Sequence, residues 1–202
     1  MKINRISLFT SEVFVFQLPE FKDWKKLIKQ IVLVENNKDI HGHDTLPLEK
    51  CNVIAKRTAW NSHQRYPVLN VLCEEIKKYL LSFIQKENYD VPDLFVQNCW
   101  INWYEKNNFS QPHDHGAALS VILFVDVEKT DAKLFFHSDN NLVLVKRENT
   151  YNNFSNVRQV DAEDGSVIFF DGSLSHSVSA NQTSKTRITV AINYDVDYKN
   201  NR

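Results

Sequence analysis

The chain has 202 residues, of which 43% are hydrophobic, and its 24 basic and 25 acidic side chains give a formal net charge of -1. This length suits one domain with a real core, and the balanced charge argues against a large nucleic-acid-binding surface, since such surfaces are strongly basic. No segment resembles a signal peptide or a membrane span, and three widely spaced cysteines, without any CxxC, suggest reduced thiols in the cytoplasm.

The first 94 residues are expected to form a mainly helical part. Residues 6–16 suit a strand, and residues 36–48 are polar and turn-like. Residues 21–34 and 67–86 repeat apolar side chains every three or four positions, which is the pattern of amphipathic helices packed on a core. The second of these helices opens with a proline, which the first helical turn tolerates.

From residue 95 onward the pattern changes to short runs rich in β-branched and aromatic residues, separated by turn residues. This spacing predicts a barrel or sandwich and not βαβ units. The expected fold class is therefore mainly β with flanking helices (α+β), in a single domain whose residues 95–198 form a barrel or jelly roll. Such barrels commonly hold a small ligand at the mouth. The expected strands cover residues 95–104, 118–127, 132–138, 141–147, 157–163, 165–171, 176–180 and 187–196.

Three histidines of this second part have the spacing of a metal site. His113 and His115 come just before a strand, and side chains two residues apart on an extended chain face the same side. His176 follows a strand and a turn, and is the expected third ligand. Non-haem iron(II) oxygenases use two histidines and one carboxylate, which leaves positions for a cosubstrate and O2. Here His115 stands where a carboxylate is expected, and Asp114 should point to the opposite face. The sequence leaves open whether His115, Asp114 or water fills this third position.

An arginine follows the third histidine at a suggestive distance. Arg187 comes eleven residues after His176, and a turn over residues 181–185 predicts a hairpin that returns Arg187 to the metal site. Arginine can grip a carboxylate with two parallel hydrogen bonds, and Thr189 on the same face can add a hydroxyl. The combination predicts a pocket for a dicarboxylate.

Other histidines and aromatic residues are lesser candidates. A second HxH motif lies in a polar segment that is followed by neither a strand nor a suitably spaced histidine and arginine, so we do not expect a metal there. A further histidine in the β part is expected to be structural or to line the pocket, as are several aromatic residues. These lesser candidates are His41, His43, His137, Trp100, Trp103 and Phe136.

Three segments together resemble a known family. PHDHGAALSVILFV (112–125), GSVIFFDGSLSHSV (165–178) and RITVAIN (187–193) are similar to the 2OG-Fe(II) oxygenases of marine bacteria and their phages, and CWINWY and TAWNS (58–62) resemble further family segments. The resemblance implies a double-stranded β-helix (jelly-roll) fold that uses Fe(II), O2 and 2-oxoglutarate. It also implies that Arg187 and Thr189 bind the distal carboxylate of 2-oxoglutarate, with Asn102 as an extra contact. The expected location is the cytoplasm of a bacterium or of a phage-infected host.

The expected reaction is hydroxylation of a small molecule or peptide, with release of succinate and CO2. Two alternatives stay open. If His115 were the first ligand, Ala117 would stand at the +2 position where a carboxylate is expected. It would leave one coordination position of the iron open, as in iron halogenases or oxidases. The chain could instead be a non-catalytic metal-binding jelly roll. The sequence identifies neither the substrate nor the oligomeric state.

Overall fold

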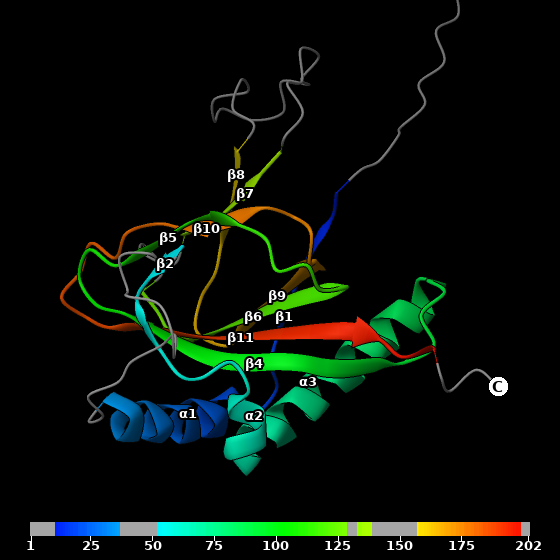
Figure 1. The fold of residues 1–202 in the computed structure, drawn as a ribbon, viewed down its shortest axis with the longest axis horizontal. Helices are drawn as coiled ribbons and strands as arrows, with labels where there is room; N and C mark the ends of the chain where they lie inside the picture. Colours follow the sequence, from blue (N-terminus) through cyan, green and yellow to red (C-terminus); the bar gives the residue numbers. More distant parts are fainter. Residues whose placement is uncertain (1–10, 37–51, 129–132, 139–156, 199–202) are drawn as a thin grey trace, which may run out of the picture.

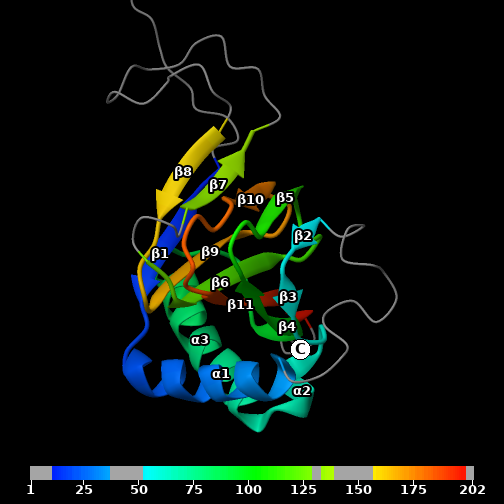
Figure 2. The same cartoon turned by 90° about the vertical axis from the view of Figure 1, so that its left-hand side faces the viewer.

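Two antiparallel β-sheets face one another, and helices cover the outer face of the larger sheet (Figures 1 and 2). This computed structural model describes residues 11–36, 52–128, 133–138 and 157–198. The expected α+β class with a jelly-roll core is confirmed.

The larger sheet has six strands in the order β1-β9-β6-β11-β4-β3, and the smaller sheet has five in the order β2-β5-β10-β7-β8. Three edge strands come from the first part of the chain, so that part is not only helical. The strands of the larger sheet are β1 (Val13–Gln17), β9 (Ser166–Asp171), β6 (Leu119–Asp126), β11 (Arg187–Val196), β4 (Leu94–Tyr104) and β3 (Lys56–Arg57). Those of the smaller sheet are β2 (Val53–Ile54), β5 (Phe109–His113), β10 (His176–Val178), β7 (Lys133–His137) and β8 (Val157–Asp161).

The two helices expected from the apolar periodicity are present as α1 (Phe21–Asn36) and α3 (Pro67–Lys86), and a short helix, α2 (Ser62–Arg65), precedes α3. Pro67 occupies the first turn of α3, as expected. The apolar face of α3 is completely buried, as one core cluster joins it to the outer face of the larger sheet. None of the described helices is both long and apolar enough to span a membrane.

Side chains alternate along each central strand of the larger sheet, so that one set faces the helices and the other set faces the smaller sheet. Along β11, Ile188, Val190 and Ile192 belong to the helix-facing core, so the residues between them face the space between the sheets. One half of that inner space is a second apolar cluster, built mainly from β6, β9 and β7. The inner faces of β4 and β11 instead bury polar side chains, among them Asn102, Arg187, Thr189 and Asn193. Buried polar groups are costly unless they are paired, so this half of the interior is where a ligand site is expected.

Three sequence expectations concern residues outside the described ranges. They are the strand at residues 141–147, most of the polar segment at residues 36–48, and residues 6–10 of the strand expected at residues 6–16. The described part of that last segment starts at Ser11, and its strand, β1, starts at Val13.

Candidate metal centre and cosubstrate site

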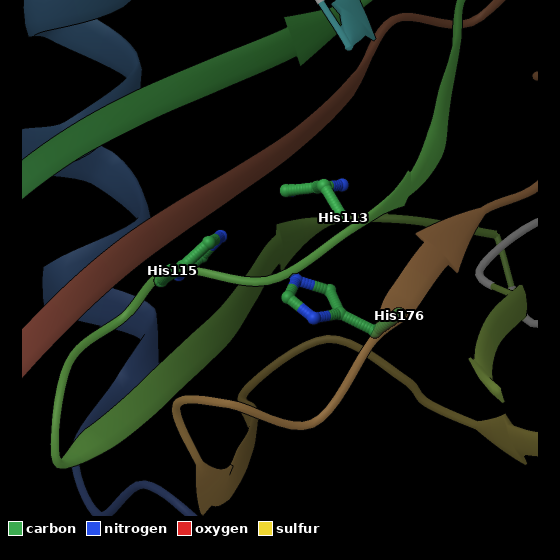
Figure 3. A group of neighbouring side chains, drawn as sticks. All are labelled: His113, His115 and His176. Atoms are coloured by element: carbon green, nitrogen blue, oxygen red, sulfur yellow. The ribbon is translucent and has the colours of Figure 1, made fainter. Parts of the chain in front are cut away.

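The structure brings the three expected ligands together. His113 ends β5, His115 lies in the loop that follows it, and His176 begins β10 (Figure 3). One candidate ligand atom from each side chain lies within 4.8 Å of the others. We call these three residues the histidine triad. Asp114 is exposed and lies outside this group, as expected from its position between the two histidines.

Backbone contacts hold the triad in place. His176 and His113 are directly opposite each other in the β10–β5 pairing. The loop that carries His115 is tied to the turn after β9, because the His115 N–H donates to the Gly172 carbonyl at 3.0 Å. Gly172 approaches the same loop so closely that an added Cβ would lie 2.2 Å from the carbonyl oxygen of Ala117. Only glycine therefore fits at this contact.

Hydrogen bonds to the Nδ1 atoms set the orientation of all three rings. The Nδ1 of His113 lies 2.7 Å from the Gln111 carbonyl oxygen, and the Nδ1 of His176 lies 3.0 Å from the Leu174 carbonyl oxygen. A backbone carbonyl only accepts, so each Nδ1 must carry the proton and each Nε2 keeps its lone pair. This is the usual arrangement of metal-binding histidines, in which the second nitrogen donates to a carbonyl or carboxylate.

His115 is oriented by a side-chain network in place of a backbone carbonyl. Its Nδ1 lies 2.8 Å from the Oδ1 of Asn193, which also accepts a hydrogen bond from the Ser120 hydroxyl at 2.9 Å. The Nδ2 of Asn193 donates to Asn98 at 2.8 Å, which fixes the direction of the amide. No sequence motif pointed to these residues, although a polar side chain within an apolar run such as Leu119–Asp126 was a usable signal.

Burial keeps the triad uncharged. Desolvation lowers the pKa of His115 to about 4 and that of His176 to about 3, and it also lowers the pKa of His113. Neutral imidazole is the form that binds metals. Three neutral nitrogen ligands in one cluster suit a divalent transition metal such as iron(II), so the residues present fit the metal that the sequence implies.

The expected carboxylate-binding residues lie buried on the inner face of the larger sheet. Arg187 is 2% exposed, donates from Nη2 to the Ser179 carbonyl at 2.8 Å, and lies with its guanidinium carbon 4.6 Å from the centre of the Tyr104 ring. Thr189 is opposite Asn102, and Arg187 is opposite Tyr104, in the β11–β4 pairing. Arg187 and Thr189 thus share one buried face of β11, as expected from their spacing.

The expected hairpin between His176 and Arg187 is wrong. β10 pairs with β5 and β7 in the smaller sheet, whereas β11 pairs with β4 and β6 in the larger one. The connection therefore crosses from one sheet to the other, and the side chain of Asn181 bonds to Tyr104 and Lys185 along the way. Arg187 still reaches the vicinity of β10, because its side chain contacts Ser179.

Arg57 is a buried arginine near this site that was not predicted from the sequence. It is 6% exposed, and β3 places it opposite Asn102. Burial raises the pKa of Tyr104, and the nearby charges of Arg187 and Arg57 oppose that rise, so both guanidinium groups lie near this ring. A two-residue strand carries no periodicity, so no pattern in the sequence indicates that Arg57 faces the interior.

The lesser candidates fall in several places. The Trp100 ring lies 5.5 Å from that of His115, and the Phe136 ring lies 6.2 Å from that of His176. Trp103 instead belongs to the helix-facing core and donates to Asn36. The Nε2 of His137 lies 2.8 Å from the Ser177 hydroxyl, which suits the structural role expected for it. His41 and His43 lie outside the described residues.

The chain matches one family model in sequence and several solved structures in fold. Residues 98–193 match the model of a family described as "Putative 2OG-Fe(II) oxygenase". No curated protein matches the chain in sequence. The fold is similar to that of a prolyl-4-hydroxylase from Pseudomonas putida, with a TM-score of 0.61 and 11% identity over 93% of this chain and 94% of that one.

Two further structures are similar to the same degree. HygX from Streptomyces hygroscopicus, solved with nickel, 2-oxoglutarate and hygromycin B bound, has a TM-score of 0.64 and 13% identity over 94% of this chain and 84% of that one. A prolyl hydroxylase from Trichoplax adhaerens has a TM-score of 0.62 and 13% identity over 91% and 83%. At such identities the likeness shows the fold alone. Residues 98–193, which contain the histidine triad and Arg187, belong to the 2OG-Fe(II) oxygenase family, whose enzymes use iron(II), 2-oxoglutarate and O2.

Proposed function

We propose that the chain is a hydroxylase in which the histidine triad holds Fe(II), Arg187 and Thr189 bind the distal carboxylate of 2-oxoglutarate, and Asn102 adds a contact. The observation that carries this proposal is the convergence of three neutral imidazoles, each fixed through Nδ1, within 4.8 Å. Iron(II) with 2-oxoglutarate and O2 supplies the oxidising power to hydroxylate a substrate, with release of succinate and CO2.

The triad contributes position and no charge. With a carboxylate among the ligands, the protein would neutralise one of the two positive charges of the metal. Three neutral imidazoles would leave both charges in place. Together with the buried charge of Arg187, they would exceed the two negative charges of 2-oxoglutarate by one. Charges in such a low-dielectric interior interact more strongly than in water.

Arg187 and Thr189 contribute a carboxylate site behind the metal. Arg187 lies at the end of an inner face that is shielded from solvent, where a charge-assisted bidentate pair is strong. Asn102 lies beside Thr189, and its Oδ1 is buried without a hydrogen-bond partner among the described residues. An amide oxygen only accepts, so this atom can take a donor from a bound molecule or a neighbouring side chain, whereas the proposed contact with the carboxylate would come from the amide N–H group.

Aromatic side chains close the far side of the triad. The Phe170 ring lies 4.9 Å from that of His176, and both it and Phe136 belong to the apolar cluster between the sheets. These apolar side chains would keep water from one side of a bound metal, which limits side reactions.

The alternative with an open metal position has less support from the geometry. That alternative required His115 as the first ligand and Ala117 as the second position. Instead His113 joins the triad, so three protein nitrogens converge. A hydroxylase is therefore the function that the site supports best.

The proposal is tested by two independent measurements. The first is succinate formation by the Fe(II)-loaded protein with 2-oxoglutarate and O2, which separates an enzyme from a binding module. The second is calorimetry of 2-oxoglutarate binding to the Zn(II)-loaded protein. Removing one partner of a buried charged pair costs about 2–5 kcal/mol, so we expect Arg187→Met to weaken 2-oxoglutarate binding by about 10²-fold.

Matched variants make this test specific. Thr189→Ser keeps the hydroxyl and should bind 2-oxoglutarate almost as the wild type does. His176→Ala should lose Zn(II) affinity, whereas His137→Ala should retain it, because His137 lies outside the triad. Unchanged 2-oxoglutarate affinity in Arg187→Met, or unchanged Zn(II) affinity in His176→Ala, would show that the site is assigned wrongly.

A further inference from the structure

Two stacked tryptophans extend from the metal centre towards the surface. Trp100 is 4% exposed on the inner face of β4, and its ring lies 5.5 Å from that of His115. The Trp60 ring lies 4.9 Å from that of Trp100 and is 40% exposed. We call this pair the indole wall. Its inner member touches the triad and its outer member meets solvent.

Backbone bonds to β4 hold the outer member of the indole wall in place. The Cys99 N–H donates to the Trp60 carbonyl at 2.8 Å, and the Thr58 N–H donates to the Ile101 carbonyl at 3.0 Å. The Ile101 N–H in turn donates to the Thr58 hydroxyl at 3.0 Å. Trp60 is partly exposed although its backbone is held firmly, so burial does not explain its position. An indole held in this way suits a preformed contact surface.

A positive charge lies over this wall. The guanidinium carbon of Arg57 is 5.0 Å from the centre of the Trp60 ring, in the geometry of a cation–π contact. Arg57 comes from β3, at one edge of the larger sheet, whereas Arg187 comes from β11 near its middle. Arg57 lies over the Trp60 ring and Arg187 lies over the Tyr104 ring, so each guanidinium makes its cation–π contact with a different aromatic side chain.

The inner member of the wall has an unused donor. The Nε1 of Trp100 is buried and has no hydrogen-bond partner among the described residues. Buried indole N–H groups usually have a partner, so the exception calls for an explanation. An oxygen atom of a molecule bound beside the triad would supply the missing acceptor.

We propose that the indole wall and Arg57 form the substrate-binding face of the metal centre, and that the substrate is an organic carboxylate. Its carboxylate pairs with Arg57, its apolar part lies against Trp60, and Trp100 donates to one of its oxygen atoms. A flat apolar surface, a cation above it and a buried donor beside the metal together select this chemistry over a neutral or cationic substrate. The inference rests on the proposed function, because it requires the triad to hold the reacting metal.

The test uses phenylacetate and phenylacetamide as probes, since the two differ mainly in charge. Each is titrated into the 15N-labelled protein loaded with Zn(II) and 2-oxoglutarate, and the indole N–H signals of the four tryptophans are followed by NMR. Trp60→Phe and Trp100→Phe assign the signals. We expect phenylacetate to shift the Trp60 and Trp100 signals and to bind about tenfold more tightly than the amide, as a charge-assisted pair requires.

Variants of two arginines separate the roles. Arg57→Met should reduce phenylacetate affinity to the level of the amide while leaving 2-oxoglutarate affinity, measured by calorimetry, unchanged. Arg65→Met is the matched control, because Arg65 also lies over an aromatic ring, 5.5 Å from the centre of Tyr66, but outside the site. It should change neither affinity.

Several results would overturn the inference. They are equal affinity for the two probes, no phenylacetate binding, or shifts confined to Trp24 and Trp103, all of which are read from the wild type alone. Loss of 2-oxoglutarate affinity in Arg57→Met would place Arg57 in the cosubstrate site, and so overturn the inference while leaving the proposed function intact. Failure of the wild type to bind 2-oxoglutarate would contradict the proposed function itself.

Discussion

Gly172→Ala should damage the metal centre without touching any ligand. An added Cβ would lie 2.2 Å from the Ala117 carbonyl oxygen, whereas ordinary contacts begin at about 3.4 Å. The two segments must therefore separate by about 1.2 Å, the difference of these distances. Ala117 is two residues from His115, and the His115 N–H is bonded to the Gly172 carbonyl, so the displacement passes directly to this histidine.

The expected result is a weaker metal site in a folded protein. Overpacking of this kind costs about 1–3 kcal/mol of stability. Changes to groups that orient a metal ligand lower metal affinity by about 10–100-fold, and a misplacement of about 1 Å can reduce a rate by about 10²-fold. Zn(II) affinity is measured by competition with a chelator, succinate formation gives the rate, and thermal unfolding reports that the variant is folded.

Gly116→Ala provides the control for this prediction. Gly116 has a φ of 62°, but nothing lies within 4 Å of an added Cβ. This variant should lose about 1–2 kcal/mol from backbone strain and keep nearly the wild-type affinity for Zn(II). If Gly172→Ala also binds Zn(II) as the wild type does, the close approach does not position His115 and the reasoning fails.

Three further predictions follow from the polar groups of the fold. Asn193→Leu removes the acceptor that orients His115, so Zn(II) affinity should fall by about 10–100-fold in chelator competition, and an unchanged affinity would remove Asn193 from the site. Burial lowers the pKa of two members of the histidine triad to about 4 and about 3. Below their ordinary pKa of 6.5 the unfolded chain then binds more protons than the folded one, so the metal-free protein should lose up to about 1.4 kcal/mol per pH unit per histidine as the pH falls from 6.5 towards 4. Urea unfolding at pH 7 and pH 5 measures this loss, and equal stability at both values would contradict it. Although burial raises the pKa of Asp126, hydrogen bonds from Lys25 and two other lysines hold that pKa well below its usual range. Asp126→Asn should therefore cost about 1–3 kcal/mol in urea unfolding at neutral pH, whereas Glu75→Gln at an exposed pair should cost almost nothing, and equal effects would refute this account.

The sequence was most informative where structure is local. Both long helices were predicted almost to their ends, because the apolar periodicity runs through each of them and Pro67 marks a start. The order of HxH, strand, histidine and Arg-x-Thr indicated which residues meet, although the hairpin proposed to join them does not exist. The residues converge because both sheets fold over one interior, which no local pattern encodes.

The site residues that were not predicted from the sequence depend on pairing between strands that are distant in the chain. Asn193 orients His115 because β11 lies beside β6, and Arg57 faces the interior because β3 pairs with β4 at one register. A shift of one residue would reverse both side chains. The same alternation separates Trp100 from Trp103, which are three positions apart and face opposite sides of the sheet, although both were predicted as possible pocket residues.

The all-histidine composition of the triad has a consequence for how the protein acquires its metal. Nitrogen ligands without a carboxylate follow the general order in which nickel, copper and zinc bind more tightly than iron(II). A site of this kind does not favour iron by affinity, so the metal that it holds in a cell depends on which ions are available when the chain folds. Protein purified from zinc-rich medium should therefore be inactive until it is stripped and reloaded anaerobically with iron(II).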